Sequence, residues 1–236
     1  MSLLKAAKDG SPWKCRQLLE AGSDVEERNK KGFTPLLLAA YFGKAEVCEL
    51  LLEKGKVNME EATPGGNTAL KLAATEGHTS TVALLLSRGA RVDTRNKDGC
   101  TPLLAAVQKG FTKVCKLLLA AGSDVREKTS ITMFTPLHLA VIYGHEKIIQ
   151  LLFSHKAIIN SKNKTGGTPL LFASQQGQLA SVVTLLQAGA DPFLSDVDGS
   201  LPIHRAASEC QSEVVRILIE DMGCSPDQVT HQTALQ

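Results

Sequence analysis

The chain has 236 residues, enough for one or two ordinary globular domains, and its 26 basic and 24 acidic residues leave a net charge of only +2. That balance argues against a nucleic acid or a membrane surface as the partner, because both attract proteins through dense positive charge. Apolar residues make up 43% and charged residues 21%, which excludes a disordered chain, while 4% aromatic residues suit thin layers packed with Ala and Leu.

The sequence shows neither a membrane-spanning segment nor a secretory signal. It lacks a run of about 18 apolar residues, the length that a transmembrane helix needs. Lys5 interrupts the apolar stretch at the N-terminus, which does not match a signal peptide. We therefore expect a cytoplasmic or nuclear protein that does not insert into a membrane.

A four-residue pattern recurs along the chain at intervals of 32 to 34 residues. Its first copy is Thr34-Pro35-Leu36-Leu37, and later copies begin at Thr68, Thr101, Thr135, Thr168, Leu201 and Thr233. Counting back 33 residues from Thr34 reaches Met1, so an earlier unit begins at the N-terminus. A period of this length indicates stacked supersecondary units.

Glycine and leucine residues keep phase with this pattern. The position nine residues after each start holds Gly10, Gly43, Gly77, Gly110, Gly144 and Gly177, with Cys210 as the exception. The position seventeen residues after each start holds Leu18, Leu51, Leu85, Leu118, Leu152, Leu185 and Leu218. A second glycine follows at Gly22, Gly55, Gly89, Gly122 and Gly189, with Lys156 and Met222 departing. The four-residue pattern, the two glycine positions and the leucine position recur together, which establishes the repeat.

Each unit predicts a pair of short helices. Thr34 can cap a helix with its hydroxyl, and Pro35 suits the first helical position because its missing N–H needs no partner there. The small Ala39-Ala40 pair permits close approach of a neighbouring helix, and Gly43 can take the left-handed conformation that ends the helix. A second apolar helix follows, and polar segments such as Asn29–Phe33 are expected to form hairpin-like fingers between units.

These elements resemble the ankyrin repeat, and the resemblance covers essentially the whole chain. It implies an all-α solenoid of stacked helix-turn-helix units joined by β-hairpin-like fingers. We expect one domain with a cap-like repeat at 1–31, repeats at 32–65, 66–98, 99–132, 133–165, 166–198 and 199–230, and the start of a truncated repeat at 231–236. Because an array seldom stops just after Thr233-Ala234-Leu235, we expect the chain to be a fragment of a longer protein.

Two departures from the family pattern bear on local structure. Only His138 and His204 keep the family's histidine, which the resemblance implies is a brace for the Thr-Pro turn rather than a catalytic base. Met133 replaces the usual glycine before the fifth unit's Thr, so we expect a weakened or reshaped turn there. Asn58 and Asn160 lie near the ends of units, where the Asn of ankyrin domains can be hydroxylated.

The sequence contains no complete motif for catalysis or metal binding. The six cysteines form no C-x-x-C pair and no Cys/His cluster with ligand spacing, so neither a metal site nor a cofactor is expected. Cys15, Cys48 and Cys115 occupy a position that other units fill with Val or Ile, which predicts core packing. Cys100, on a predicted fingertip, is the best candidate for an exposed thiol. His145-Glu146 begins like a zinc-protease motif, but Ile149 occupies the second ligand position.

The resemblance implies that a partner docks on the fingertips and the C-terminal ends of the first helices. The aromatic residues at those positions concentrate in the second and fifth units. We therefore predict a two-anchor groove for an extended peptide or a protein edge, because surface aromatic residues often anchor binding. The candidate contact residues are Lys30, Lys31, Phe33, Tyr41, Phe42, Gln108, Lys109, Ile131, Phe134, Ile142 and Tyr143, and Met133 extends the second patch.

The sequence favours a scaffold or adaptor module that binds a protein or peptide, has no small-molecule substrate and is not an enzyme. We expect the isolated chain to be monomeric. An alternative is a substrate-recruiting arm of a larger enzyme, such as a ubiquitin ligase or a kinase. Another is a structural or tethering solenoid. Nucleic-acid binding is the weakest alternative, since Lys30, Lys31, Lys97 and Lys164 form no dense stripe.

Overall fold

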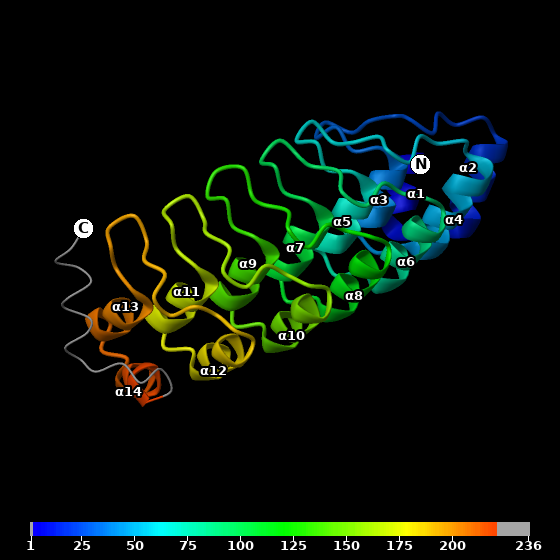
Figure 1. The fold of residues 1–236 in the computed structure, drawn as a ribbon. Helices are drawn as coiled ribbons and strands as arrows, with labels where there is room; N and C mark the ends of the chain where they lie inside the picture. The colour runs from blue at the N-terminus through cyan, green and yellow to red at the C-terminus, as the bar shows by residue number, and fades with distance from the viewer. Residues whose placement is uncertain (1, 221–236) are drawn as a thin grey trace. The chain divides into compact units, whose positions relative to one another are not determined.

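The computed structural model describes residues 2–220, which form fourteen α-helices. Contacts divide the chain into two compact units, Met1–Asp124 and Val125–Gln236. In each unit the helices form helix-turn-helix pairs, and a finger connects one pair to the next (Figure 1). The predicted repeat starting at Thr233 lies outside the described residues.

The first unit contains four helix pairs. Its helices are α1 (Leu3–Asp9), α2 (Pro12–Glu20), α3 (Pro35–Tyr41), α4 (Ala45–Lys54), α5 (Ala69–Thr75), α6 (Thr79–Ser87), α7 (Pro102–Gln108) and α8 (Thr112–Ala120). The helices α1, α3, α5 and α7 pack in one row, each against the next, and α2, α4, α6 and α8 pack in a second row. Each pair therefore buries its apolar face against its neighbours, as a pair alone cannot.

The second unit repeats this arrangement. Its helices are α9 (Pro136–Ile142), α10 (Glu146–Ser154), α11 (Pro169–Gln175), α12 (Leu179–Gln187), α13 (Pro202–Ser208) and α14 (Ser212–Glu220). The rows are α9, α11 and α13 on one side and α10, α12 and α14 on the other.

Threonine hydroxyls cap the first helix of most pairs. The Oγ1 atoms of Thr34, Thr68, Thr101, Thr135 and Thr168 each accept a hydrogen bond from the backbone N–H three residues later. At α13 the residue is Leu201, which has no side-chain acceptor, and the backbone N–H of Leu201 instead donates to Nδ1 of His204 at 3.2 Å. The predicted threonine caps are confirmed. Of the first helices from α3 to α13, only α13 lacks a threonine cap, and His204 supports its turn instead.

The first helix of each pair ends in a left-handed residue. Gly43 has φ 67° and Gly77 has φ 78°, values that L residues with a Cβ rarely adopt. Cys210 occupies the same position with φ 56°, and Lys156 takes a left-handed φ of 61° where most units have their second glycine. The turn geometry is therefore kept where the glycine is missing, at a cost in backbone strain.

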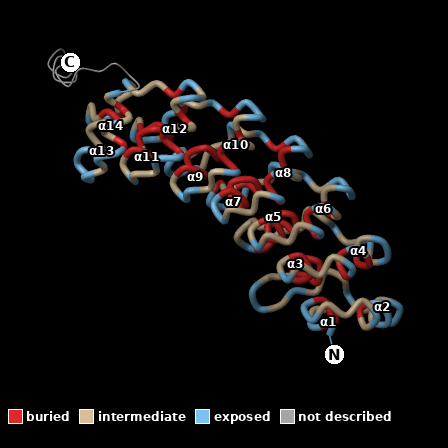
Figure 2. The backbone as a smooth tube through the Cα atoms, turned by 90° about the horizontal axis from the view of Figure 1, so that it is seen from below, coloured by how far each residue is buried: buried red, intermediate tan, exposed pale blue. Residues whose placement is uncertain are grey.

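The core is a series of thin layers centred on the first helices (Figure 2). Ala39 and Ala40 are fully buried, as are Ala73 and Ala74, so neighbouring helices approach closely. Cys15, Cys48 and Cys115 are also buried, which confirms their predicted place in the core. Burial raises the pKa of Cys48 to about 12 and that of Cys115 to about 12, because a thiolate loses solvation there.

One side chain organises each finger. In the first finger Asn29 Oδ1 accepts hydrogen bonds from the N–H groups of Lys31 (2.9 Å) and Phe33 (3.0 Å), and Asn96 and Asn163 do the same in their fingers. Adjacent fingers join within each unit: Lys97 N donates to Gly65 O at 3.0 Å, and Lys164 N donates to Thr132 O at 3.0 Å. The fingertips are therefore defined platforms for their side chains.

The finger before α9 differs, as the loss of its glycine predicted. Thr129 takes the place of the asparagine, and Met133 N donates to Thr129 O across a turn one residue longer than that of the first finger. Met133 adopts φ 59°, and its side chain is exposed. The reshaped turn projects Ile131 into solvent.

The predicted all-α repeat fold is confirmed. The fingers carry hairpin hydrogen bonds, but within residues 2–220 the structure assigns no extended strand and records an isolated antiparallel bridge between Ala62 and Thr68. No helix in this range is long and apolar enough to cross a membrane.

Candidate functional site

Three aromatic side chains of the first unit meet at nearly right angles. The rings of Phe33 and Tyr41 lie 6.0 Å apart, centroid to centroid, at 78°, and those of Tyr41 and Phe42 lie 5.0 Å apart at 88°. Phe33 comes from the first finger, and Tyr41 and Phe42 from the C-terminal end of α3. We call these three residues the aromatic corner. Edge-to-face contacts of this kind are favourable and hold the rings in place.

A pocket of about 420 Å³ opens beside the aromatic corner. It is lined by Lys8, Asn29, Lys31, Phe33, Leu38, Tyr41 and Phe42. The ammonium Nζ of Lys8 lies 5.5 Å from the ring centroid of Phe42, a cation–π contact. Lys31 reaches the pocket from the fingertip that Asn29 organises. The pocket thus combines apolar surface with two positive charges.

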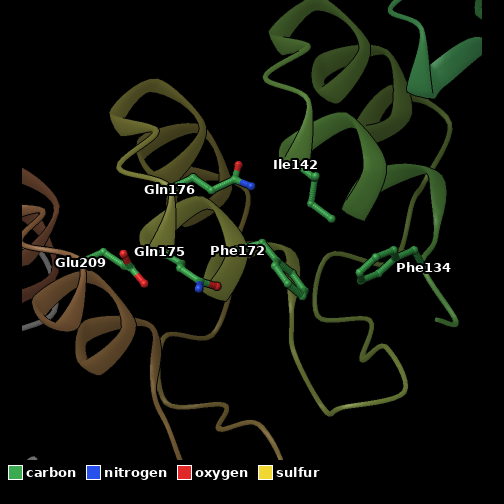
Figure 3. A pocket seen from close by; sticks show the side chains of 6 residues that line it. All are labelled: Phe134, Ile142, Phe172, Gln175, Gln176 and Glu209. Atoms are coloured by element: carbon green, nitrogen blue, oxygen red, sulfur yellow. The ribbon is translucent and has the colours of Figure 1, made fainter.

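A second pocket, of about 450 Å³, lies in the second unit between the ends of its first helices and a finger (Figure 3). It is lined by Phe134, Ile142, Phe172, Gln175, Gln176 and Glu209. Phe134 precedes α9, Ile142 ends it, Phe172 and Gln175 lie on α11, and Glu209 follows α13. The lining is apolar at one end and bears amides and a carboxylate at the other (Figure 3).

Two phenylalanines that line this second pocket pack against His138. The ring of Phe134 lies 5.4 Å from that of Phe172 in an edge-to-face contact, and both lie within 6.0 Å of the imidazole, measured between centroids. His138 Nδ1 accepts from Thr135 N at 3.2 Å, and His138 Nε2 donates to Gly167 O at 3.1 Å. Burial lowers the pKa of His138 to about 4, so the ring is neutral near pH 7 and its predicted role as a brace is confirmed.

The pockets bring together some of the predicted contact residues. Lys31, Phe33, Tyr41 and Phe42 line the first pocket, and Phe134 and Ile142 line the second. The others lie outside these two linings: Lys30, Gln108, Lys109, Ile131 and Tyr143. All five are exposed, Ile131 to 73% and Tyr143 to 47%, and Tyr143 stacks on His145 at 6.2 Å between centroids. Their part in binding stays a prediction.

The linings also contain residues outside the candidate list: Lys8, Asn29 and Leu38 in the first pocket, and Phe172, Gln175, Gln176 and Glu209 in the second. Leu38 and Phe172 each lie four residues after the threonine that starts their unit. That position is one helical turn before the helix-end pair, so it faces the same side of the helix. Leu38 and Phe172 could therefore have been predicted from the sequence, as the residues one helical turn before the helix-end pairs. Lys8 could not, because only the folded structure shows its contact with Phe42.

Cysteine exposure corrects one expectation. Cys100 is half-buried, its thiol lies 3.6 Å from the carbonyl oxygen of Thr101, and burial raises its pKa. The exposed thiol among residues 2–220 is that of Cys210. Cys100 follows the turn of its finger rather than forming it, and its backbone N–H donates to Asn96 Oδ1 at 2.8 Å.

The two asparagines near the ends of units differ in their contacts. Asn58 is exposed, and its Oδ1 accepts from Glu60 N at 3.1 Å. Asn160 is half-buried, and its Oδ1 accepts from Asp191 N in the next repeat at 2.9 Å. Hydroxylation of either stays a prediction. In the described part of the chain, no group of three or more His, Cys, Asp or Glu residues is placed to hold a metal ion.

The helix pairs, the capped turns and the fingers define a class of protein, and sequence comparison establishes the family. The family model described as ankyrin repeats (3 copies) matches residues 3–96, 63–129, 89–163 and 156–230. This chain belongs to the ankyrin-repeat family.

Solved and curated proteins agree with that assignment. The crystal structure of the ankyrin repeat domain of Bcl-3, described as a member of the IkappaB family, superposes with a TM-score of 0.82 at 28% identity, covering 92% of this chain and 98% of that one. The ankyrin repeat and KH domain-containing protein mask-1 of Caenorhabditis elegans is 36% identical over 163 residues, 69% of this chain and 6% of that protein. The putative palmitoyltransferase ZDHHC13 of Danio rerio is 30% identical over 207 residues, 86% of this chain and 32% of that protein.

The chain therefore spans a third or less of the length of these two curated relatives. Ankyrin repeats are in general non-catalytic protein-interaction modules, and the relatives combine them with other domains. What is shared with this chain is the repeat array.

Proposed function

We propose that this chain is a protein-interaction module that binds a partner protein or peptide without catalysing a reaction. The observation that carries the proposal is the aromatic corner of Phe33, Tyr41 and Phe42 beside an open pocket. Phe42 is 36% exposed although its neighbours hold it in a fixed orientation. Ordered, partly exposed aromatic rings bind with little loss of side-chain entropy, which is why they are frequent anchors at interfaces.

A second anchor in the other unit is proposed at the pocket lined by Phe134, Ile142 and Phe172. Tyr143 and Ile131 are exposed on the same elements and would extend the contact. Each anchor belongs to one unit, so each can be tested without assuming how the units are arranged.

The buried side chains whose pKa values are shifted support a role without catalysis. A catalytic acid or base needs a pKa matched to its task and access to substrate. His138 is fully buried, with both ring nitrogens engaged by Thr135 and Gly167. Cys48 and Cys115 are buried in the core with their thiols protonated. These shifts follow from packing.

The test is comparative purification from the source cell. The chain would be used as bait beside two variants, Tyr41→Ala and Tyr143→Ala, each checked for folding by circular dichroism. We expect at least one protein to bind the unaltered chain and to be depleted by one or both variants, and to bind directly when purified. Bound proteins that are the same for all three baits would contradict the proposed anchors.

A second candidate is that the same surfaces recruit a substrate to a catalytic domain. The observation that favours it is the match to a protein named as a putative palmitoyltransferase, of which this chain covers 32%. Sequencing the full transcript decides between the two: a catalytic domain in the same protein supports recruitment, and its absence leaves an adaptor.

A further inference from the structure

The pocket beside the aromatic corner has a distinctive charge. Of the seven residues that line it, Lys8 and Lys31 are basic and none is acidic. The remaining lining is aromatic or aliphatic apart from Asn29, whose Oδ1 is occupied by the N–H groups of Lys31 and Phe33. An occupant therefore meets apolar surface with positive charge at its edge.

The two lysines come from different elements, and each is presented in a defined way. Lys8 projects from α1, and its ammonium is held over the face of Phe42. Lys31 is exposed on a fingertip fixed by Asn29. Acidic residues at the base of the same finger are engaged elsewhere: Glu27 Oε1 accepts from Leu4 N at 3.0 Å, and Glu26 Oε1 accepts from Asn58 N at 3.1 Å.

We infer that this pocket selects an acidic segment, in which a negatively charged side chain lies next to an aromatic or aliphatic one in an extended partner chain. The negative group would lie near the ammonium groups of Lys8 and Lys31, and the apolar neighbour would pack on Phe33 and Tyr41. This inference rests on the proposed interaction function and adds the chemistry of the partner. The negative group is a carboxylate or a phosphate, since both pair with ammonium groups.

A cationic occupant is excluded by the same geometry. Aromatic side chains set at right angles can hold an ammonium ion from a ligand. Here Lys8 already places an ammonium over Phe42, and Lys31 adds a second positive charge at the pocket. A cation from a partner would meet two like charges, so the aromatic corner serves an anion with an apolar neighbour.

The pocket of the second unit provides an internal contrast. Its lining contains Glu209 and two glutamines but neither lysine nor arginine. It offers the apolar side chains of Phe134, Ile142 and Phe172 without the positive charge. Selection for negative charge is therefore expected at the first pocket and not at the second.

The experiment is a selection of short displayed random peptides against the full chain. The most enriched peptide is then synthesised with a fluorescent label, and its affinity is measured by anisotropy at low and high salt. We expect enrichment of Asp or Glu beside Phe, Tyr, Leu or Ile, and binding that weakens as salt screens the charges. A version carrying phosphoserine in place of the acidic residue distinguishes a phosphate from a carboxylate as the better ligand.

Charge-reversal variants locate the effect. The double variant Lys8→Glu, Lys31→Glu is expected to weaken binding about tenfold or more, through loss of attraction and added repulsion. Lys31→Glu alone, at an exposed fingertip, should weaken it severalfold and guards against a folding defect from the loss of the Lys8–Phe42 contact. Lys164→Glu makes the same change at an exposed fingertip of the other unit and should have little effect. The pair Lys8→Arg, Lys31→Arg should retain binding.

Each other outcome is decisive. Enrichment of neutral or basic peptides overturns the inference and leaves the interaction function standing. Equal losses from Lys31→Glu and Lys164→Glu also overturn it, because they indicate general charge attraction. If the chain enriches no peptide, both this inference and the peptide-binding function are overturned.

Discussion

The Nε2 atom of His138 lies 3.1 Å from the carbonyl oxygen of Gly167, which is 29 residues further along the chain. This hydrogen bond joins the start of α9 to the next finger. Because Nδ1 of His138 accepts from Thr135 N, the ring must be neutral with its proton on Nε2. A protonated ring would lose the acceptor that the bond from Thr135 needs.

Stability should therefore depend on pH through His138. Its pKa is about 4 in the folded chain and near 6.5 when the ring is solvated, so between these values the unfolded chain binds more protons than the folded one. The free energy of unfolding should be at its full value above about pH 6.5 and fall as the pH drops toward 4. The loss is of the order of 3 kcal/mol, and urea unfolding followed by circular dichroism measures it.

The matched variant is His138→Leu, because Leu37, Leu104 and Leu171 fill the same position in other units. It should flatten the pH dependence over this range while the chain stays folded. An unchanged slope in the variant would assign the effect to another group.

Binding energy should concentrate at the two tyrosines if both anchors are used. Tyr41→Ala and Tyr143→Ala should each weaken binding of the partner identified by purification. The expected loss of binding free energy is more than about 1 kcal/mol for each, measured by titration calorimetry. Tyr41→Phe keeps the packing on Phe33 and Phe42 and serves as the control for the first anchor. Unchanged affinity in both alanine variants would exclude the two-anchor arrangement.

Glycines at left-handed turns should differ in their tolerance of a side chain. A Cβ at Gly77 (φ +78°) would lie 2.7 Å from a ring carbon of Phe111, whereas a Cβ at Gly89 (φ +84°) meets nothing within 4 Å. Gly89→Ala should cost about 1 kcal/mol from backbone strain alone. Gly77→Ala should cost roughly 2–3 kcal/mol, since strain and overlap combine. Thermal or urea unfolding gives both values.

Replacing a left-handed residue by glycine tests the same backbone strain. Lys156 adopts φ 61° at the position that Gly89 occupies in its own unit. Lys156→Gly should stabilise the chain by up to about 1 kcal/mol, because glycine adopts this conformation without strain. A loss of stability would show that the Lys156 side chain contributes more than its backbone costs.

Thiol reactivity should follow burial. With Cys224 replaced by Ser, since it lies outside the described residues, Cys210 should react first with a maleimide and Cys100 more slowly. Cys48 and Cys115, whose pKa values are raised to about 12, should react only as the chain unfolds. Mass spectrometry of peptides from timed samples gives the order. Faster labelling of Cys100 than of Cys210 would restore the original expectation for Cys100.

Features that depend on a few consecutive residues followed from the sequence. The threonine caps, the left-handed Gly43 and the reshaped turn at Met133 each arise from bonds within one turn of chain, so local chemistry is sufficient to predict them. The core cysteines were also predictable, because Cys15, Cys48 and Cys115 repeat in phase with apolar residues. Even the aromatic corner was expected, since Tyr41 and Phe42 are adjacent at a helix end.

What the sequence alone determined is the repeating unit, and what the tertiary structure decided is which side chains of successive units meet. The helix pair, its turns and its buried face are complete within about 33 residues, so their pattern is visible in the chain. Contacts such as Lys8 over Phe42, Phe134 against Phe172 and His138 with Gly167 join residues 29 to 38 apart. They depend on how one unit stacks on the next and on where each side chain then points, so the two pockets and their different charges emerged only from the folded chain.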